Sequence, residues 1–347
     1  MFIERLKKLN PSLVTAATRL HQAGELRANT YLLDTATMTA NTRVIRAEAD
    51  RLGLSLYAMA KQFGRNRDAC DAVVEGGIEA CVAVDIQCME AVARSRMRIG
   101  HVGHLVQPHR GSEDAVVTAR PEVVSVFHQA IAERLGAAAR RAGIEQAVLL
   151  RVVAPGDRFY FGHGGGFPLE GIEDAAGKVD AVDGLRVAGV VSFPALLADA
   201  EKRRLATTPN LATLTEAAER LRRAGFEVEQ VNAPGTTSSG ALELLADAGA
   251  THAEPGNGLH GTTPLMVFDD DSPEVPAIVY VSEVSHFDGD DAYVFGAGLY
   301  IDKILGEYGL RAFCGRDEEV LAKTLVPARQ DHGQGLWLAL QPGEDPE

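Results

Sequence analysis

Several features that mark secreted, membrane-spanning or disulfide-linked proteins are missing from this sequence. No uninterrupted apolar run approaches the ~18 residues that a membrane-spanning helix needs, and the N-terminal decapeptide lacks the long apolar core of a secretory signal. The 4 cysteines form no CxxC pair and no disulfide-like framework, so a reducing compartment is expected. These absences together predict a soluble, cytoplasmic protein.

Positive charge is also scarce. The 347 residues include 34 Lys and Arg against 48 Asp and Glu, a formal net charge of −14. This balance argues against nucleic acid or an anionic membrane as the main partner, although a small anionic ligand would respond to local groups instead. The chain length, 46% hydrophobic residues and 35 glycines fit one large α/β domain with a smaller domain beside it.

Strand and helix signals alternate along most of the chain. Residues 80–84, 146–153 and 185–193 are apolar enough to be buried strands, and Ala115–Thr118 is predicted to be another strand. The clearest helix is predicted over residues 209–224, with Thr208 as its N-cap. Roughly eight such strands alternating with helices are typical of a (β/α)8 TIM barrel, and a doubly wound open sheet remains the alternative.

The regular alternation of predicted strands and helices ends near residue 265. The later strands, predicted at 277–282, 292–295 and 335–340, have no regular helices between them. We therefore expect an N-terminal lead-in over 1–29, a barrel over 30–264 and a small β domain over 265–347.

A single lysine ends an apolar run in the first half of the predicted barrel. The stretch Leu54–Ala60 is uncharged and mostly apolar, and it leads directly into Lys61. Such a run predicts a buried strand, and active sites of barrels form at the carboxyl ends of their strands. A lysine there can have a depressed pKa and act as an amine nucleophile. The alternative is a surface lysine that snorkels into water.

Two glycine-rich turns follow consecutive late strands, at 232–240 and 254–258. In barrels the loops after the seventh and eighth strands commonly bind phosphate. Glycines let backbone N–H groups approach an anion, and Thr or Ser hydroxyls add donors. The alternative is a pair of ordinary tight turns.

The order of these motifs resembles the fold-type III pyridoxal-phosphate enzymes, which include alanine racemase, D-threonine aldolase and the eukaryotic-type ornithine decarboxylases. The sequence is most similar to the alanine racemase-like family often called YhfX. The resemblance covers about residues 28–300 and rests on Lys61, Val102–Gln107, Gly164–Phe167, Gly235–Thr237 and Ala253–Gly256.

The resemblance implies that Lys61 holds pyridoxal phosphate as a Schiff base. It also implies that the phosphate is held by two groups of residues, namely Gly235, Thr236 and Thr237 with Gly256, Asn257 and Gly258. Glu254 resembles the decarboxylase glutamate that pairs with the pyridine nitrogen. A carboxylate there keeps that nitrogen protonated, so the ring can stabilise a Cα carbanion. Alanine racemase has arginine in this role, which leaves room for other chemistry at Cα.

Other positions are implied more loosely. His104 follows a strand and is expected to line the cofactor site. Arg151 and His163 are expected near the substrate, although Arg151 also suits an ordinary ion pair. Phe193 falls where alanine racemase places a histidine against the cofactor ring, and core packing is the alternative for it.

A racemase needs a second acid/base group on the opposite face of Cα. The resemblance places this group in the small domain of a homodimer partner, and Tyr300 and Cys314 are the candidates. Metal alternatives are the pairs His286 with Asp288 and Asp331 with His332, but their spacing does not require a metal, and none is expected.

The sequence is therefore interpreted as a cytoplasmic, homodimeric, PLP-dependent amino-acid racemase or epimerase. It would act at Cα through Lys61 and a carbanion or quinonoid intermediate. The alternatives are a PLP-dependent D-amino-acid aldolase or decarboxylase, and a non-catalytic PLP-binding protein.

Overall fold

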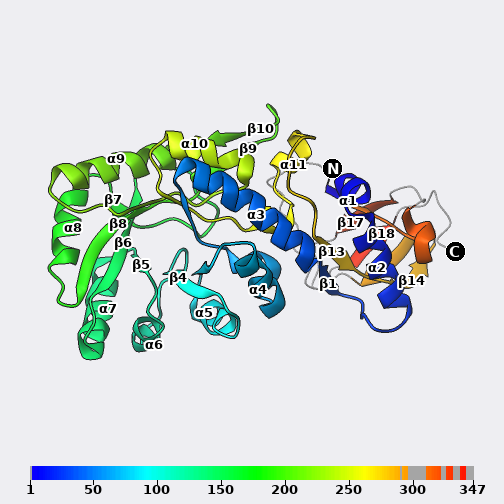
Figure 1. Cartoon of the computed structure of the whole chain (residues 1–347), viewed down its shortest axis with the longest axis horizontal. Helices are drawn as coiled ribbons and strands as arrows, with labels where there is room; N and C mark the ends of the chain where they lie inside the picture. Colours follow the sequence, from blue (N-terminus) through cyan, green and yellow to red (C-terminus); the bar gives the residue numbers. More distant parts are fainter. Residues whose placement is uncertain (1, 290, 296–309, 322–325, 331–336, 341–347) are drawn as a thin grey trace.

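The computed structural model describes the whole chain except residues 1, 290, 296–309, 322–325, 331–336 and 341–347. The molecule is elongated, with a large strand-and-helix body at one end and a smaller strand-rich body at the other (Figure 1). Residues 2–22 and 337–340, near the two ends of the chain, both lie at the smaller end (Figure 1).

The large body is built on a parallel sheet whose strands follow one another around a barrel. Their order in the sheet is β2 (Ser55–Leu56), β12 (His252–Ala253), β11 (Gln230–Asn232), β8 (Leu185–Val191), β6 (Gln146–Val153), β5 (Val123–Val126), β4 (Arg98–Val102) and β3 (Ala80–Ala83). The two edge strands are joined just beyond β2 by a parallel bridge between Ala58 and Cys81, where the Ala58 amide donates to the Ala80 carbonyl at 2.8 Å. This closure confirms the predicted (β/α)8 barrel over the open sheet.

Helices cover the outside of this barrel (Figure 1). They are α3 (Thr35–Leu52), α4 (Arg67–Glu75), α5 (Ile86–Val92), α6 (Glu113–Thr118), α7 (Gln129–Ala142), α8 (Ile172–Asp180), α9 (Pro209–Arg223) and α10 (Leu242–Asp247). Strands β3 and β5 are buried at every residue, as expected when helices cover one face of a barrel and side chains fill its centre.

One predicted strand is wrong. Ala115–Thr118 belongs to helix α6, and the strand lies later, at Val123–Val126. Two acidic residues, Glu113 and Asp114, occupy the first turn of α6, where they complement the helix dipole. Val116 and Val117 are buried from this helix. A run of β-branched residues therefore became helical because its N-terminal charges and its packing favoured a helix.

The predicted helix at residues 209–224 is confirmed as α9, but its N-terminus differs from expectation. Thr208 occupies the N-cap position without making a side-chain cap hydrogen bond. Its hydroxyl instead donates to the Pro194 carbonyl at 2.5 Å. Thr208 thus ties the start of the helix to the loop after β8.

The small body combines the two ends of the chain. Strand β1 (Thr30–Leu33) pairs antiparallel with β13 (Ile278–Val281). A second antiparallel sheet has the order β14 (Val284–Asp288), β15 (Asp291–Phe295), β18 (Trp337–Leu340), β17 (Val326–Gln330) and β16 (Leu310–Ala312). Strand β1, which the sequence assigned to the barrel, pairs with the small body instead. The predicted division at 29/30 and 264/265 stays a proposal.

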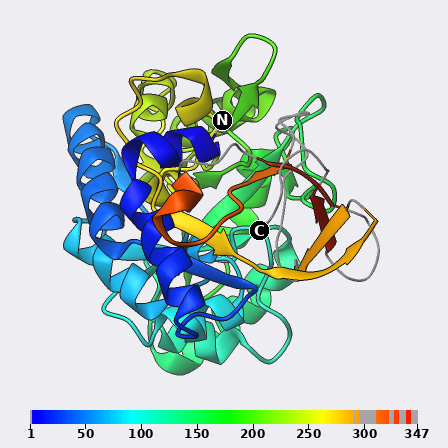
Figure 2. The same ribbon diagram turned by 90° about the vertical axis from the view of Figure 1, so that its right-hand side faces the viewer.

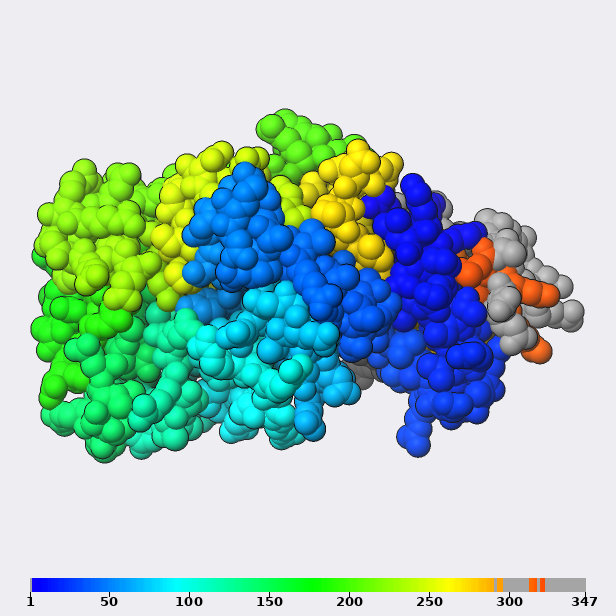
Figure 3. Space-filling model, in the orientation of Figure 1, coloured from blue at the N-terminus to red at the C-terminus, as the bar shows by residue number. Residues whose placement is uncertain are grey.

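Helices α1 (Phe2–Leu9) and α2 (Pro11–Gln22) lie beside the C-terminal strands (Figure 2). Their side chains Leu6, Leu13 and Val14 form a small apolar cluster with Val320. In the space-filling view the N-terminal residues, in dark blue, adjoin the orange C-terminal ones (Figure 3). Among the described residues, no helix combines the length and hydrophobicity needed to span a bilayer.

Candidate active site

Lys61 lies just past the end of a barrel strand, as predicted, although the strand is shorter than expected. Strand β2 ends at Leu56, and Lys61 belongs to a 3-10 turn, η1 (Ala60–Phe63). Burial lowers the pKa of Lys61, while the charge of Glu254 acts in the opposite direction. The amine makes no hydrogen bond or ion pair with the part of the chain that the structure describes. It is thus an available nucleophile at the barrel mouth.

The turn that carries Lys61 meets the glycine-rich turns after β11 and β12. The Met59 amide donates to the Pro255 carbonyl at 2.8 Å. A Cβ atom placed on Gly256 would lie 2.7 Å from Cγ of Gln62, and one on Gly258 would lie 2.6 Å from the Thr237 carbonyl oxygen. The three segments are therefore brought together as the sequence predicted, at a separation that only glycine permits.

Unpartnered hydroxyls lie within the turn after β11. Ser238 and Ser239 are buried, and neither hydroxyl oxygen has a hydrogen-bond partner. Buried polar groups are normally satisfied, so two adjacent exceptions indicate a place for a ligand rich in acceptors. The Thr237 hydroxyl donates to the Gly235 carbonyl at 3.1 Å, and the Ser239 amide donates to Glu274 at 2.7 Å. Sequence analysis did not single out the two serines, although the run Thr236–Ser239 was the signal for them.

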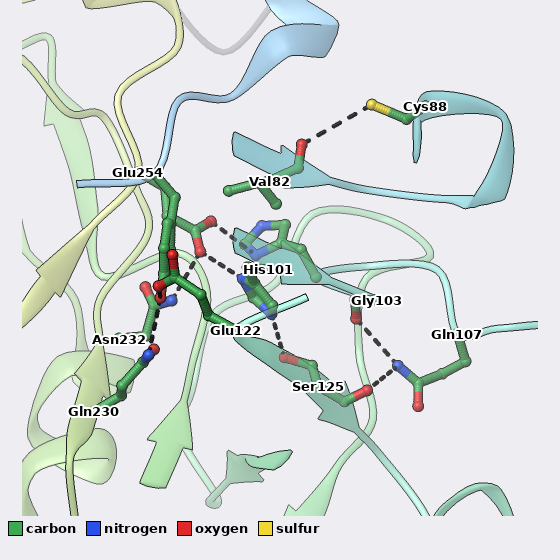
Figure 4. A network of polar contacts seen from close by, with 12 residues as sticks. Val82, Cys88, His101, Gly103, Gln107, Glu122, Ser125, Gln230, Asn232 and Glu254 are labelled. Atoms are coloured by element: carbon green, nitrogen blue, oxygen red, sulfur yellow. Dashed lines mark hydrogen bonds and ion pairs between the residues drawn. The ribbon is translucent and has the colours of Figure 1, made fainter. Parts of the chain in front are cut away.

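Glu254 follows β12 and points into the barrel interior, where side chains from other strands surround it (Figure 4). Its Oε1 accepts hydrogen bonds from Nδ1 of His101 at 2.7 Å and from Nδ2 of Asn232 at 2.9 Å. Its Oε2 is buried without a hydrogen-bond partner, although Nδ1 of His104 lies 3.1 Å away. One oxygen of the carboxylate is therefore held by the protein, and the other is open.

The charge state of this cluster follows from its burial and its hydrogen bonds. Burial opposes ionisation of Glu254, but the neighbouring imidazoles of His104 and His101 and the hydrogen bonds from His101 and Asn232 outweigh it, and its pKa is lowered. Burial lowers the pKa of His104 to about 3, so that ring is neutral. The lowered pKa of Glu254 thus reflects both the two imidazoles beside it and the hydrogen bonds from His101 and Asn232, which hold its Oε1.

His101, His104 and Glu254 lie close enough together to suggest a metal site, with ligand atoms within 4.8 Å of one another. The 2.7 Å contact between His101 and Glu254 is a hydrogen bond, however, and a protonated Nδ1 cannot bind a metal ion. Two ligands remain, which are too few for a closed structural site. The arrangement instead suits a carboxylate held for a cationic N–H donor.

Arg151 on β6 is fully buried, yet two of its three guanidinium nitrogens make no hydrogen bond. Its Nη2 donates to the carbonyls of His163 and Phe193, each at 3.1 Å, while Nε and Nη1 have no hydrogen-bond partner. Burial lowers the pKa of Arg151 to about 10, with Asp157 and Glu254 acting in the opposite direction. A buried cation with two open donors is a ready site for an anionic oxygen.

Aromatic side chains line the same region. The ring of Phe193 meets that of His104 edge-on, with centroids 5.2 Å apart. It stacks on the ring of Tyr160 at 5.6 Å and lies 6.0 Å from that of His163. The structure thus brings Phe193, His104 and His163 together.

The remaining predicted positions either lie elsewhere in the structure or are not among the described residues. Tyr300, Asp331 and His332 lie outside the described residues. Cys314 is half-buried and follows Phe313, which packs against the small apolar cluster of α1 and α2. His286 lies on β14, where its ring stacks on Tyr293 at 4.9 Å. The roles predicted for Tyr300 and Cys314 stay predictions.

Comparison with known proteins identifies the family to which this chain belongs. A family model described as "Alanine racemase, N-terminal domain" matches residues 33–264. The uncharacterized protein YhfX of Escherichia coli (strain K12) is 38% identical over 301 residues, which cover 86% of this chain and 77% of YhfX.

Solved structures resemble the chain over nearly its whole length. D-threonine aldolase from Filomicrobium marinum matches with a TM-score of 0.64 at 18% identity, covering 92% of this chain and 83% of the aldolase. Alanine racemase from Streptomyces coelicolor A3(2) matches at 0.62 and 20% identity, covering 91% and 85%. D-threo-3-hydroxyaspartate dehydratase from Delftia sp. HT23 matches at 0.62 and 16% identity, covering 91% and 84%. At these identities the structures support the fold, and their different named reactions leave the reaction of this chain open.

Proposed function

Since the chain belongs to the family of the alanine racemase N-terminal domain, an alanine racemase-like family that binds pyridoxal phosphate, we propose that it is a PLP-dependent amino-acid racemase or epimerase. The observation that carries this proposal is the pairing of a half-buried lysine with a buried glutamate that has one open oxygen, both at the mouth of one barrel.

The described residues fit this cofactor. Lys61 offers an unpaired amine for its aldehyde, and the open Oε2 of Glu254 offers an acceptor for its ring nitrogen. The hydroxyls of Ser238 and Ser239 supply unpartnered donors beside the turns that the sequence assigned to the phosphate. We therefore assign phosphate binding to both groups, namely Gly235, Thr236, Thr237, Gly256, Asn257 and Gly258 together with the two serines.

The protein's own groups then have distinct tasks. When bound, the cofactor supplies an electron-withdrawing ring that stabilises negative charge at Cα. Glu254 holds a proton on the ring nitrogen, which strengthens this withdrawal. Lys61 moves a proton on one face of Cα, a task that its lowered pKa favours. Arg151 orients the substrate carboxylate through its open Nε and Nη1, with His163 beside it.

The opposite face of Cα needs a second acid/base group. We assign it to Tyr300 or Cys314 of the partner chain in a homodimer, because both residues belong to the C-terminal part of the sequence. Size measurement in solution tests the homodimer, and loss of inversion in Tyr300→Phe or Cys314→Ser identifies the group.

The main alternative is cleavage of a bond at Cα, as in an aldolase, a decarboxylase or a dehydratase. It is supported by a carboxylate rather than an arginine at residue 254 and by the structural similarity to D-threonine aldolase and D-threo-3-hydroxyaspartate dehydratase. A PLP-binding protein without turnover is the second alternative.

Incubation of the holoprotein with L- and D-amino acids in deuterated water separates these possibilities. Deuterium at Cα with inversion supports racemisation, loss of carbon or water supports a lyase, and the absence of exchange supports binding alone. Glu254→Gln should slow Cα exchange while the cofactor remains bound, and exchange at the wild-type rate would contradict the role given to Glu254.

A further inference from the structure

His101 forms a hydrogen-bonded chain that spans the barrel interior. Its Nδ1 lies 2.7 Å from Oε1 of Glu254, and its Nε2 lies 2.6 Å from Oγ of Ser125. His101 and Ser125 are both fully buried. The chain joins β5, β4 and the end of β12 (Figure 4), so it fixes the carboxylate against two other strands.

The partners determine where the protons lie. The ionised carboxylate of Glu254 can only accept, so Nδ1 of His101 carries a proton, and Nε2 of the neutral imidazole is then the acceptor for the Ser125 hydroxyl. That Nδ1–H then donates to Oε1 of Glu254. Oε1 receives a second hydrogen bond from Asn232, and Oε2 is left without a donor.

We propose that His101, oriented by Ser125, is a positioning residue that keeps Glu254 ionised and leaves its Oε2 open toward the cofactor ring nitrogen. This inference rests on the proposed function for the role given to Oε2. The ionisation of Glu254 itself does not depend on the cofactor and can be measured in the apoprotein. A carboxylate that accepts two N–H hydrogen bonds has a lower pKa than one without them. The Nδ1–H of His101 supplies one of these two hydrogen bonds, and Asn232 supplies the other.

The sequence of groups, serine to histidine to carboxylate, also occurs in hydrolases, where the serine is a nucleophile. Ser125 is fully buried within β5, and a nucleophile must be reachable by its substrate. Ser125 is better explained as the hydrogen-bond donor that keeps Nε2 of His101 unprotonated.

Other ionisable groups also act on Glu254, and a test has to hold them constant. His104 lies against Oε2. Lys61 and Arg151 interact with its charge from η1 and β6, as do Tyr57 and His252 from the segments around β2 and β12. Substitutions at His101 leave all five in place.

Two amide substitutions at His101 distinguish the effect of the Nδ1 hydrogen bond from the effect of losing the imidazole ring. The side-chain nitrogen of His101→Asn can occupy the place of Nδ1 and keep the hydrogen bond to Glu254, whereas that of His101→Gln matches Nε2 and loses it. The readout is a pH titration of the apoprotein labelled with 13C at glutamate carboxyls, with the Glu254 signal assigned by its absence in Glu254→Gln. We expect the midpoint of Glu254 to rise by about one pH unit or more in His101→Gln and to stay near wild type in His101→Asn.

A third variant tests the hydrogen bond between Ser125 and His101. Ser125→Ala should preserve the carboxylate hydrogen bond but weaken the preference for the Nδ1-protonated tautomer, which 15N chemical shifts of His101 report. Thermal melting of each apoprotein shows that it is folded. If a variant does not fold, the wild-type 15N shifts alone decide, because an Nε2-protonated His101 overturns the inference.

The inference is also overturned if His101→Gln and His101→Asn give the same Glu254 midpoint as wild type. Its failure is distinguishable from failure of the proposed function. A shifted midpoint in a protein that exchanges no Cα proton keeps the inference and rejects the racemase, and an unshifted midpoint in an active enzyme does the reverse.

Discussion

Gly258 lies so close to Thr237 that a Cβ atom on the glycine would lie 2.6 Å from the threonine carbonyl oxygen. The turns after the last two barrel strands are therefore in direct contact. Gly258→Ala should push them apart and destabilise the apoprotein by about 1–3 kcal/mol, as overpacking does, and it should weaken cofactor retention. Denaturant unfolding and PLP titration by fluorescence measure both effects.

The matched control for that substitution is Gly177→Ala in α8, where an added Cβ meets nothing within 4 Å. Alanine is favoured over glycine in a helix, so this control should be neutral or stabilising. Equal cofactor affinity in Gly258→Ala and Gly177→Ala would show that contact between the two turns does not matter for binding.

The second prediction concerns Lys61. Because burial lowers its pKa, the neutral amine is present at lower pH than for a free lysine, whose pKa is about 10.4. Borohydride reduction of the PLP-treated protein should attach the cofactor to the peptide containing residue 61, and Lys61→Ala should abolish the adduct. Lys178→Ala, which removes an exposed lysine on α8, serves as the control. An adduct that persists in Lys61→Ala would contradict the assignment.

Much of this arrangement was predictable from the order of residues along the chain. The apolar run before Lys61 and the glycine-rich turns near 235 and 256 follow barrel strands, and parallel strands end at one face. The sequence therefore predicted that Lys61, Thr237 and Glu254 would meet. Their hydrogen-bond partners were not predictable, because they come from strands far away in sequence.

His101, Ser125 and Arg151 illustrate that limit. His101 lies on β4 and Ser125 on β5, within strands whose residues are almost all buried, and nothing in the local pattern distinguishes a buried polar residue with a partner from a surface one. Their pairing depends on register across the barrel. Arg151 was named from the resemblance, but its two open donors became visible only with the loop around His163 in place.

A third prediction follows from buried neutral histidines. Burial lowers the pKa of His104 to about 3 and those of His252 and His260 to about 4, whereas a histidine in an unfolded chain titrates near 6.5. Below pH 6.5 the unfolded chain binds protons that the native state does not, so stability falls as pH falls. Each histidine contributes a slope of up to about 1.4 kcal/mol per pH unit between pH 6.5 and its native pKa.

His260→Leu isolates one of these contributions. Its Nε2 is buried without a partner, and leucine fills a similar volume without titrating. Urea unfolding of the apoprotein at a series of pH values between 4.5 and 6.5 should show a slope shallower than wild type by up to about 1.4 kcal/mol per pH unit. Parallel curves for the two proteins would mean that His260 is protonated in the native state.

The last prediction separates binding from stability at Arg151. Its guanidinium forms no ion pair among the described residues and is held by the carbonyls of His163 and Phe193, so an apolar replacement removes a buried charge but leaves those two carbonyls without their donor. The two effects oppose each other, and Arg151→Met should melt near the wild-type temperature. It should also bind carboxylate substrates about 10- to 100-fold more weakly, because hydrogen bonds to charged groups contribute about 1.5–3 kcal/mol.

Arg151→Lys tests the geometry at constant charge. Lysine keeps the positive charge but not the planar fork of donors, so we expect affinity between those of wild type and Arg151→Met. Arg220→Lys on α9 is the control, because Arg220 pairs with Glu173 at 2.7 Å away from the barrel mouth. If Arg151→Met lost several kcal/mol of stability but bound substrate normally, the guanidinium would serve to hold the carbonyls of His163 and Phe193, and the substrate carboxylate would have to bind elsewhere.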